Sequence, residues 1–186
     1  MAARTLQHYL KLVVLTLLMA GCQQHAFKNG KEGKCVGVKD GDTIVVVIDG
    51  IQTTIRLAEI DCPEKRQAFG QRAKKFTSDM CFGKEVSVVE KNKDRYGRTI
   101  GIVYINDNTI LNKELVRAGM AWRYIQYSED EEYGTLEKQA RAAKIGLWAD
   151  ENPEAPWEFR KERKGTPTHQ KKKYEPAESG DVETES

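Results

Sequence analysis

Strong charge of one sign is missing from this chain of 186 residues, whose 30 Lys and Arg nearly balance 28 Asp and Glu. This excludes a broad basic field that would attract nucleic acid, so any phosphate contact must be local. Histidine (3) and cysteine (4) are scarce, and their spacings lack the short paired intervals of a zinc site. With 39% hydrophobic residues, the chain is long enough for one domain with a real core and a tail.

A membrane-spanning run is also missing, because the apolar run from Leu12 to Ala20 is shorter than the about 20 residues needed. The run is typical of a secretory signal peptide. The segment 18–22 (LMAGC) resembles a bacterial lipobox, which implies removal of residues 1–21 and a lipid on Cys22. We therefore expect an exported protein, lipid-anchored to the bacterial cell envelope, that meets the membrane only through that lipid. A soluble secreted or periplasmic protein is the alternative.

Three cysteines remain after Cys22, so at least one has no partner within the chain. Export permits a disulfide, and Cys35–Cys81 is one possibility. The alternative is that both are free thiols in the core, where cysteine is usually buried.

Hydrophobic periodicity predicts five strands and three helices. The strands are expected at 35–39, 43–48, 51–60, 85–91 and 99–105, with a two-residue hairpin turn at Asp49-Gly50. The helices are expected at 67–82, 112–117 and 129–144, with Asn112 as a helix cap. This order predicts an α+β, mainly β fold: a small Greek-key barrel of the OB type.

The predicted domain organisation has four parts: a signal peptide (1–21), a polar tether (22–33), the folded domain (34–160) and a tail (161–186). The prolines after Asp150 break the helical pattern, although Trp157 and Phe159 can dock on the barrel. The tail is charged and poor in apolar residues, so we predict that it is disordered.

Acidic residues fall at the predicted strand ends in two segments, 40–43 (DGDT) and 61–64 (DCPE). In an antiparallel barrel these ends can meet, which brings Asp42 and Asp61 together. Two carboxylates with backbone carbonyls and water suit Ca²⁺, with a weak Kd of roughly 10⁻⁴–10⁻³ M. The alternative is that these residues only form turns.

Three further residues complete the candidate site. Glu64 can take a proton from an attacking water, or it can simply favour a helix N-terminus. Arg56 and Arg98 suit bidentate contacts to a phosphodiester, whose developing charge they would stabilise. Surface ion pairs are the alternative for both arginines.

Substrate contacts are predicted on each side of this site. Arg95 would add a phosphate contact, and Tyr96 can stack on a base. Tyr124 and Tyr127 can form part of a base pocket. Core or turn packing is the alternative for these tyrosines.

These motifs together resemble the thermonuclease (staphylococcal-nuclease-like) family over about residues 34–160, including the segments 111–119 and 146–148 (GLW). The resemblance implies a five-stranded OB-type barrel with three helices. It also implies calcium-dependent endonuclease hydrolysis of DNA and RNA, single strands preferred, leaving 3′-phosphate ends.

The resemblance assigns roles residue by residue. It makes Asp42 and Asp61 the Ca²⁺ ligands, together with the backbone carbonyl of Cys62, where the family prototype has threonine. It makes Glu64 the general base or the residue that positions the water. It also assigns Arg56 and Arg98 to the phosphate and places Tyr96 near the nucleotide. We expect a monomer. The alternatives are a nucleic-acid-binding module that does not cut and a structural envelope lipoprotein.

Overall fold

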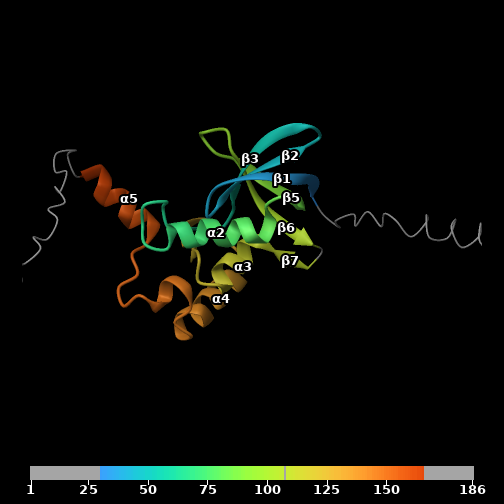
Figure 1. Cartoon of the computed structure of the whole chain (residues 1–186). Helices are drawn as coiled ribbons and strands as arrows, with labels where there is room; N and C mark the ends of the chain where they lie inside the picture. The colour runs from blue at the N-terminus through green and yellow to red at the C-terminus, as the bar shows by residue number, and fades with distance from the viewer. Residues whose placement is uncertain (1–29, 107, 166–186) are drawn as a thin grey trace, which may run out of the picture.

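The computed structural model describes residues 30–106 and 108–165, and its strands form a closed barrel (Figure 1). The strands are β1 (Lys31–Asp40), β2 (Thr43–Ile48), β3 (Ile51–Leu57), β4 (Ile60–Asp61), β5 (Glu85–Lys93), β6 (Thr99–Asn106), β7 (Thr109–Ile110) and β8 (Trp122–Arg123). The main sheet has the order β3-β2-β1-β5-β6-β7. A parallel pairing of β3 with β6 closes the first five of these strands, which confirms the predicted mainly β, OB-type barrel.

The β2–β3 hairpin confirms the predicted turn. Ile48 pairs with Ile51, and the two residues between them have positive φ angles, 51° at Asp49 and 78° at Gly50. Both angles are those of a type I′ turn, which matches the right-handed twist of the flanking strands.

The return strand is interrupted, whereas a continuous strand from 51 to 60 was predicted. Glu59 adopts a left-handed conformation with φ 66°, and the backbone N–H of Ala58 donates to Gly101 instead of continuing the hairpin. The next two residues form β4, which pairs with β8 in a separate small sheet. After this break, Asp61 pairs with Trp122 of β8 and its carboxylate contacts Arg56 on β3.

The helices are α2 (Gly70–Cys81), α3 (Leu111–Arg117), α4 (Glu131–Ala142), α5 (Pro156–Gly165) and the 3₁₀ helices η1 (Ile125–Tyr127) and η2 (Gly146–Ala149). Helix α2 begins later than predicted, because Phe69 before it is left-handed with φ 65°. The three predicted helices are present as α2, α3 and α4, and α5 is an additional helix that was not predicted. Its first residue is Pro156, a position where the missing N–H costs nothing, so this proline starts a helix and does not break one.

Asn112 does not cap a helix, contrary to the prediction. It lies inside α3, fully buried, and its side chain joins three backbone groups. Its amide donates to the carbonyls of Ala58 (3.0 Å) and Gly101 (3.2 Å), and its oxygen accepts from the N–H of Val103 (3.0 Å). The residue therefore ties α3 to β6 and to the interruption after β3.

The core lies inside the barrel and under α2, α3 and α4. Cys35 on β1 and Cys81 at the end of α2 are both fully buried there. Their sulfur atoms are 3.6 Å apart and both are free thiols, so the structure has the buried pair and not the disulfide. Figure 1 shows α2 crossing below the barrel, with α3 and α4 beneath it and α5 at the far end.

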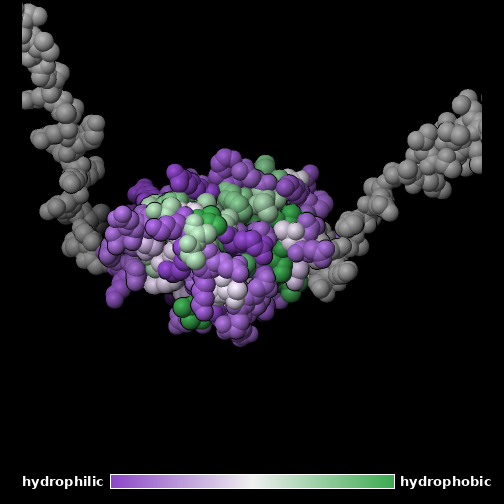
Figure 2. Space-filling model, turned by 90° about the horizontal axis from the view of Figure 1, so that it is seen from below, coloured by the Kyte–Doolittle hydropathy of each residue, from purple (hydrophilic) through white to green (hydrophobic). Residues whose placement is uncertain are grey.

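The folded part extends beyond the predicted boundaries at both ends. Strand β1 begins at Lys31, inside the predicted tether, because its first residues pair with β5. Helix α5 runs to Gly165, inside the predicted tail. The predicted signal peptide, Cys22 and the residues after 165 lie outside the described residues. Across the residues described, no helix has the length and apolarity to span a membrane. Polar residues separate the apolar patches on the face in Figure 2.

Candidate active site

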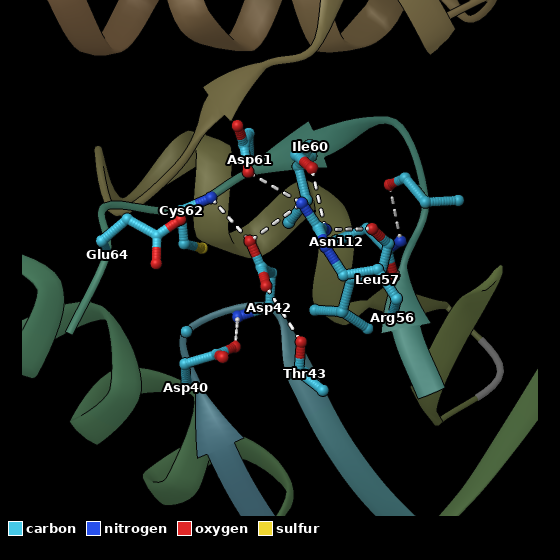
Figure 3. Close-up of polar contacts among 12 residues, drawn as sticks. Asp40, Asp42, Thr43, Arg56, Leu57, Ile60, Asp61, Cys62, Glu64 and Asn112 are labelled. Atoms are coloured by element: carbon cyan, nitrogen blue, oxygen red, sulfur yellow. Dashed lines mark hydrogen bonds and ion pairs between the residues drawn. The ribbon is translucent and has the colours of Figure 1, made fainter. Parts of the chain in front are cut away.

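The turn between β1 and β2 holds Asp42 against the segment that follows β4. Gly41 is required here, because a Cβ atom at this position would lie only 2.8 Å from the Cβ atoms of Ala73 and Cys62. One Asp42 oxygen accepts from the backbone N–H of Cys62 at 2.8 Å, and the other accepts from the Thr43 hydroxyl at 3.2 Å. The two acidic segments of the sequence are therefore joined directly (Figure 3).

Arg56 on β3 connects the carboxylates of Asp42 and Asp61. Its Nη2 lies 2.8 Å from Asp61 Oδ1 and 3.1 Å from Asp42 Oδ2. Its Nη1 donates to the carbonyls of Leu57 at 2.7 Å and Ile60 at 2.9 Å. Only 14% of this side chain is exposed, so the guanidinium is a buried support for the site as well as a candidate phosphate ligand (Figure 3).

Burial and neighbouring charges shift the pKa values of the acidic groups and of Arg56 in this cluster. Burial alone would lower the pKa of Arg56. The negative charges of Asp42 and Asp61 outweigh this effect, so the pKa of Arg56 is raised. Burial raises the pKa of Asp61, although hydrogen bonds from arginine oppose the rise. Burial and repulsion from Asp42 raise the pKa of Asp40 to about 6. This excess of closely spaced acidic groups favours a bound cation.

Glu64 lies in the loop before α2. Its backbone N–H donates to the Gln67 side chain at 3.0 Å, and its carboxylate accepts from Arg160 of α5 at 2.8 Å. The same guanidinium contacts Asp61 Oδ2 at 2.6 Å. Sequence reasoning missed Arg160, because a contact across 96 residues to a helix that was itself not predicted leaves no local signal.

Cys62 contacts the site through its backbone N–H, which donates to Asp42, and the role of its carbonyl as a metal ligand stays a prediction. Its side chain is buried, with 4% exposed, between the β1–β2 turn and α2. Burial and the neighbouring Asp42 carboxylate raise the pKa of this thiol well above its ordinary value. The group is therefore an unreactive thiol at neutral pH.

Arg95, Tyr96 and Arg98 form a second group on the β5–β6 hairpin. Asp94 organises the turn, since it accepts from the backbone N–H groups of Tyr96 (2.9 Å) and Arg98 (3.0 Å). The Arg98 side chain donates to the same carboxylate at 2.7 Å. Arg95 covers the Tyr96 ring at 4.9 Å, and 70% of this tyrosine is exposed. In residues 30–106 and 108–165, the contacts of this hairpin group are internal to it and do not reach the carboxylates of Asp42 and Asp61.

Tyr124 follows β8, next to the β4–β8 pairing that contains Asp61. Its backbone N–H donates to Glu59 at 2.9 Å, which fixes it beside β4. Its ring meets Tyr127 edge-on at 4.8 Å and stacks on Trp157 of α5 at 5.7 Å. The predicted contact of Trp157 with the domain is confirmed.

The donors at this site fit a hard cation. The carboxylates of Asp42 and Asp61 approach one nitrogen of Arg56. The carboxylate of Glu64 contacts Arg160, which also contacts Asp61. Carboxylate oxygens are the ligands that Ca²⁺ prefers, with carbonyls and water completing its six to eight positions. Within the described part of the chain, no three His, Cys, Asp or Glu side chains converge closely enough to hold a metal alone. Water and backbone oxygens would therefore supply most of the coordination.

Comparison with known proteins places the chain among nucleases. The family described as "Staphylococcal nuclease homologue" matches residues 54–150. An "Uncharacterized endonuclease" of Haemophilus influenzae is 47% identical over 132 residues, covering 70% of this chain and 74% of the relative. A "Micrococcal nuclease" of Shigella flexneri is 42% identical over 142 residues, with 71% and 82% covered. "Staphylococcal-like nuclease CAN1" of Arabidopsis thaliana is 39% identical over 111 residues, with 60% and 34% covered.

Proposed function

Because the chain belongs to the staphylococcal nuclease family and is a phosphodiester-cleaving nuclease, we propose that it is a Ca²⁺-dependent endonuclease. Its substrates are DNA and RNA, single strands preferred, and its products carry 3′-phosphate ends. The observation that carries the proposal is the approach of Asp42 and Asp61 to one nitrogen of Arg56, at 3.1 and 2.8 Å.

The metal site is built on the carboxylates of Asp42 and Asp61 and the backbone carbonyl of Cys62. A bound Ca²⁺ would supply charge stabilisation and orientation for the phosphodiester. The proposed ligands come from two segments that are distant in the sequence and that meet where β4 approaches the β1–β2 turn. Both aspartates are largely buried, at 7% and 2% exposed, which keeps their carboxylates fixed in orientation.

The remaining residues act on water and on the phosphate. Glu64, half-exposed at the rim, accepts the proton of the attacking water. Both terminal nitrogens of Arg56 already contact protein oxygens, so its Nε–H is the donor that we assign to the phosphate. Arg98 and Arg95 bind phosphate oxygens from the hairpin side, and Tyr96 and Tyr124 contact bases.

We also propose that the protein is exported and lipid-anchored through Cys22, and that it acts as a monomer. Labelling cells with an alkyne fatty acid tests the anchor. Label on the wild-type chain that disappears in Cys22→Ser supports it, and equal label on both contradicts it. Sedimentation of the chain from Gln23 to Ser186 tests the monomer.

Cleavage assays with that soluble chain test the calcium dependence. We expect single-stranded DNA to be cut in millimolar Ca²⁺ and the activity to disappear in excess chelator. Product ends are identified by whether a phosphatase is needed before extension by a polymerase. Cleavage that continues unchanged in chelator contradicts the proposed metal dependence.

A further inference from the structure

Arg160 contacts both Asp61 and Glu64. In the proposed reaction, Asp61 must be free to bind the metal and Glu64 must be free to accept a proton. The Nη2 of Arg160 lies 2.6 Å from Asp61 Oδ2, and its Nη1 lies 2.8 Å from Glu64 Oε1 and 3.3 Å from Asp61 Oδ1. One guanidinium therefore bridges the proposed metal ligand and the proposed base. Asp61 is 2% exposed, so it has little access to any other cation while Arg160 is in place.

Helix α5 is held over the site by few other contacts. Trp157 stacks on Tyr124 with an angle of 6° between the rings and meets Trp122 edge-on at 5.5 Å. Before the helix, the Gln67 side chain donates to the carbonyl of Glu154 at 2.7 Å. Residues 161–163 of the helix are exposed. A segment attached in this way can open locally without unfolding the barrel.

A guanidinium and a calcium ion exclude each other at these carboxylates. Ca²⁺ bonds oxygen directly at about 2.3–2.6 Å, so it needs the Asp61 oxygens that Arg160 now contacts. The two cations also repel each other at such short range. Arg56 belongs to strand β3 of the barrel, whereas Arg160 belongs to helix α5, which can open locally. Arg160 is therefore the arginine that can move away from Asp61.

We propose that α5 is an autoinhibitory element, in which Arg160 occupies the cation-binding side of Asp61 and Glu64 until a divalent cation displaces it. The inference rests on the proposed calcium dependence. The same helix places Trp157 on one face of Tyr124, so its departure frees that face for a base together with the metal ligands. Cation binding and exposure of the Tyr124 ring are therefore one coupled event.

Calorimetric titration of Ca²⁺ into the chain from Gln23 to Ser186 tests this inference, since that chain contains every described residue. Arg160→Gln removes the competing charge, and we expect its Kd for Ca²⁺ to fall roughly tenfold. Arg163→Gln is the matched control, because Arg163 lies on the same helix and its guanidinium packs 5.5 Å from the Phe159 ring. Its Kd should equal that of the wild type. Trp157→Ala loosens the helix without changing charge and should also lower the Kd.

Each outcome separates the inference from the proposed function. Equal or weaker Ca²⁺ binding by Arg160→Gln, with unchanged circular dichroism, overturns the autoinhibition while leaving calcium dependence intact. Absence of Ca²⁺ binding in every variant means that the calcium dependence itself is wrong, and the inference falls with it. In the wild type, Ca²⁺ should also change tryptophan fluorescence, and this change should be missing in Trp157→Ala.

Discussion

The replacement of Arg56 by methionine tests how the site is held together. Methionine fills similar space but leaves Asp42 and Asp61 facing each other without the guanidinium that lies 3.1 and 2.8 Å from them. It also removes the donors to the carbonyls of Leu57 and Ile60. Removing one partner of a buried ion pair costs about 3–5 kcal/mol, because an uncompensated charge stays behind.

We therefore expect Arg56→Met to lower the free energy of unfolding by about 3–5 kcal/mol, a large part of the roughly 5–15 kcal/mol of a typical domain. Urea unfolding in chelator measures this directly. Added Ca²⁺ should recover part of the loss, because it binds the folded state alone.

Arg98→Met is the matched control for this experiment. The Arg98–Asp94 pair is more exposed than the Arg56 pairs, with 33% of the arginine side chain accessible, so its loss should cost only about 1 kcal/mol. The double variant Arg56→Met/Asp42→Asn should recover stability relative to Arg56→Met, because Asp42 loses its arginine partner in the single variant whereas Asp61 keeps Arg160. Equal, small losses in Arg56→Met and Arg98→Met would refute the argument that Arg56 supports the site.

Three further predictions concern the rest of the fold. Asn112→Leu leaves buried backbone groups without hydrogen-bond partners, so it should lower the free energy of unfolding in urea by about 2–6 kcal/mol. Replacement of the exposed Asn152 by alanine should change this free energy little, and equal effects of the two variants would contradict the assigned bonds. The hydrogen bond from Lys113 lowers the pKa of Asp130 in the folded protein. This contact therefore stabilises the fold fully above the ordinary aspartate pKa of about 3.9, and the stabilisation is lost as the pH falls below that value. Lys113→Met should therefore lose less stability than the wild type between about pH 5 and about pH 3, and parallel losses would be the contrary result. The three described cysteines are buried thiols, so a thiol reagent should label them only in denaturant, and rapid labelling of the native chain would contradict their placement.

The sequence was most informative where structure depends on neighbouring residues. The Asp49-Gly50 turn and strand β2 follow from local conformational preference, and both have the predicted bounds. The meeting of Asp42 with the segment after β4 was also predictable, because an antiparallel barrel brings those ends together. Their roles in catalysis remain predictions.

Features that depend on distant contacts were not predictable in the same way. Asn112 has the side chain of a helix cap, but its partners come from β6 and from the residue after β3. The break at Glu59 depends on the pairing of β4 with β8, which no local pattern encodes. Arg160 looks like any charged residue near a chain end until α5 is placed over Asp61.

The replacement of Glu64 by glutamine tests the central claim most directly. With single-stranded DNA at saturating concentration in Ca²⁺, we expect the cleavage rate of Glu64→Gln to fall by at least about 100-fold, the contribution of a general base. DNA affinity should be nearly unchanged, and replacement of the exposed Glu158 of α5 by glutamine should leave the cleavage rate at the wild-type value. Cleavage by Glu64→Gln at the wild-type rate would contradict the assignment of this site as the catalytic centre.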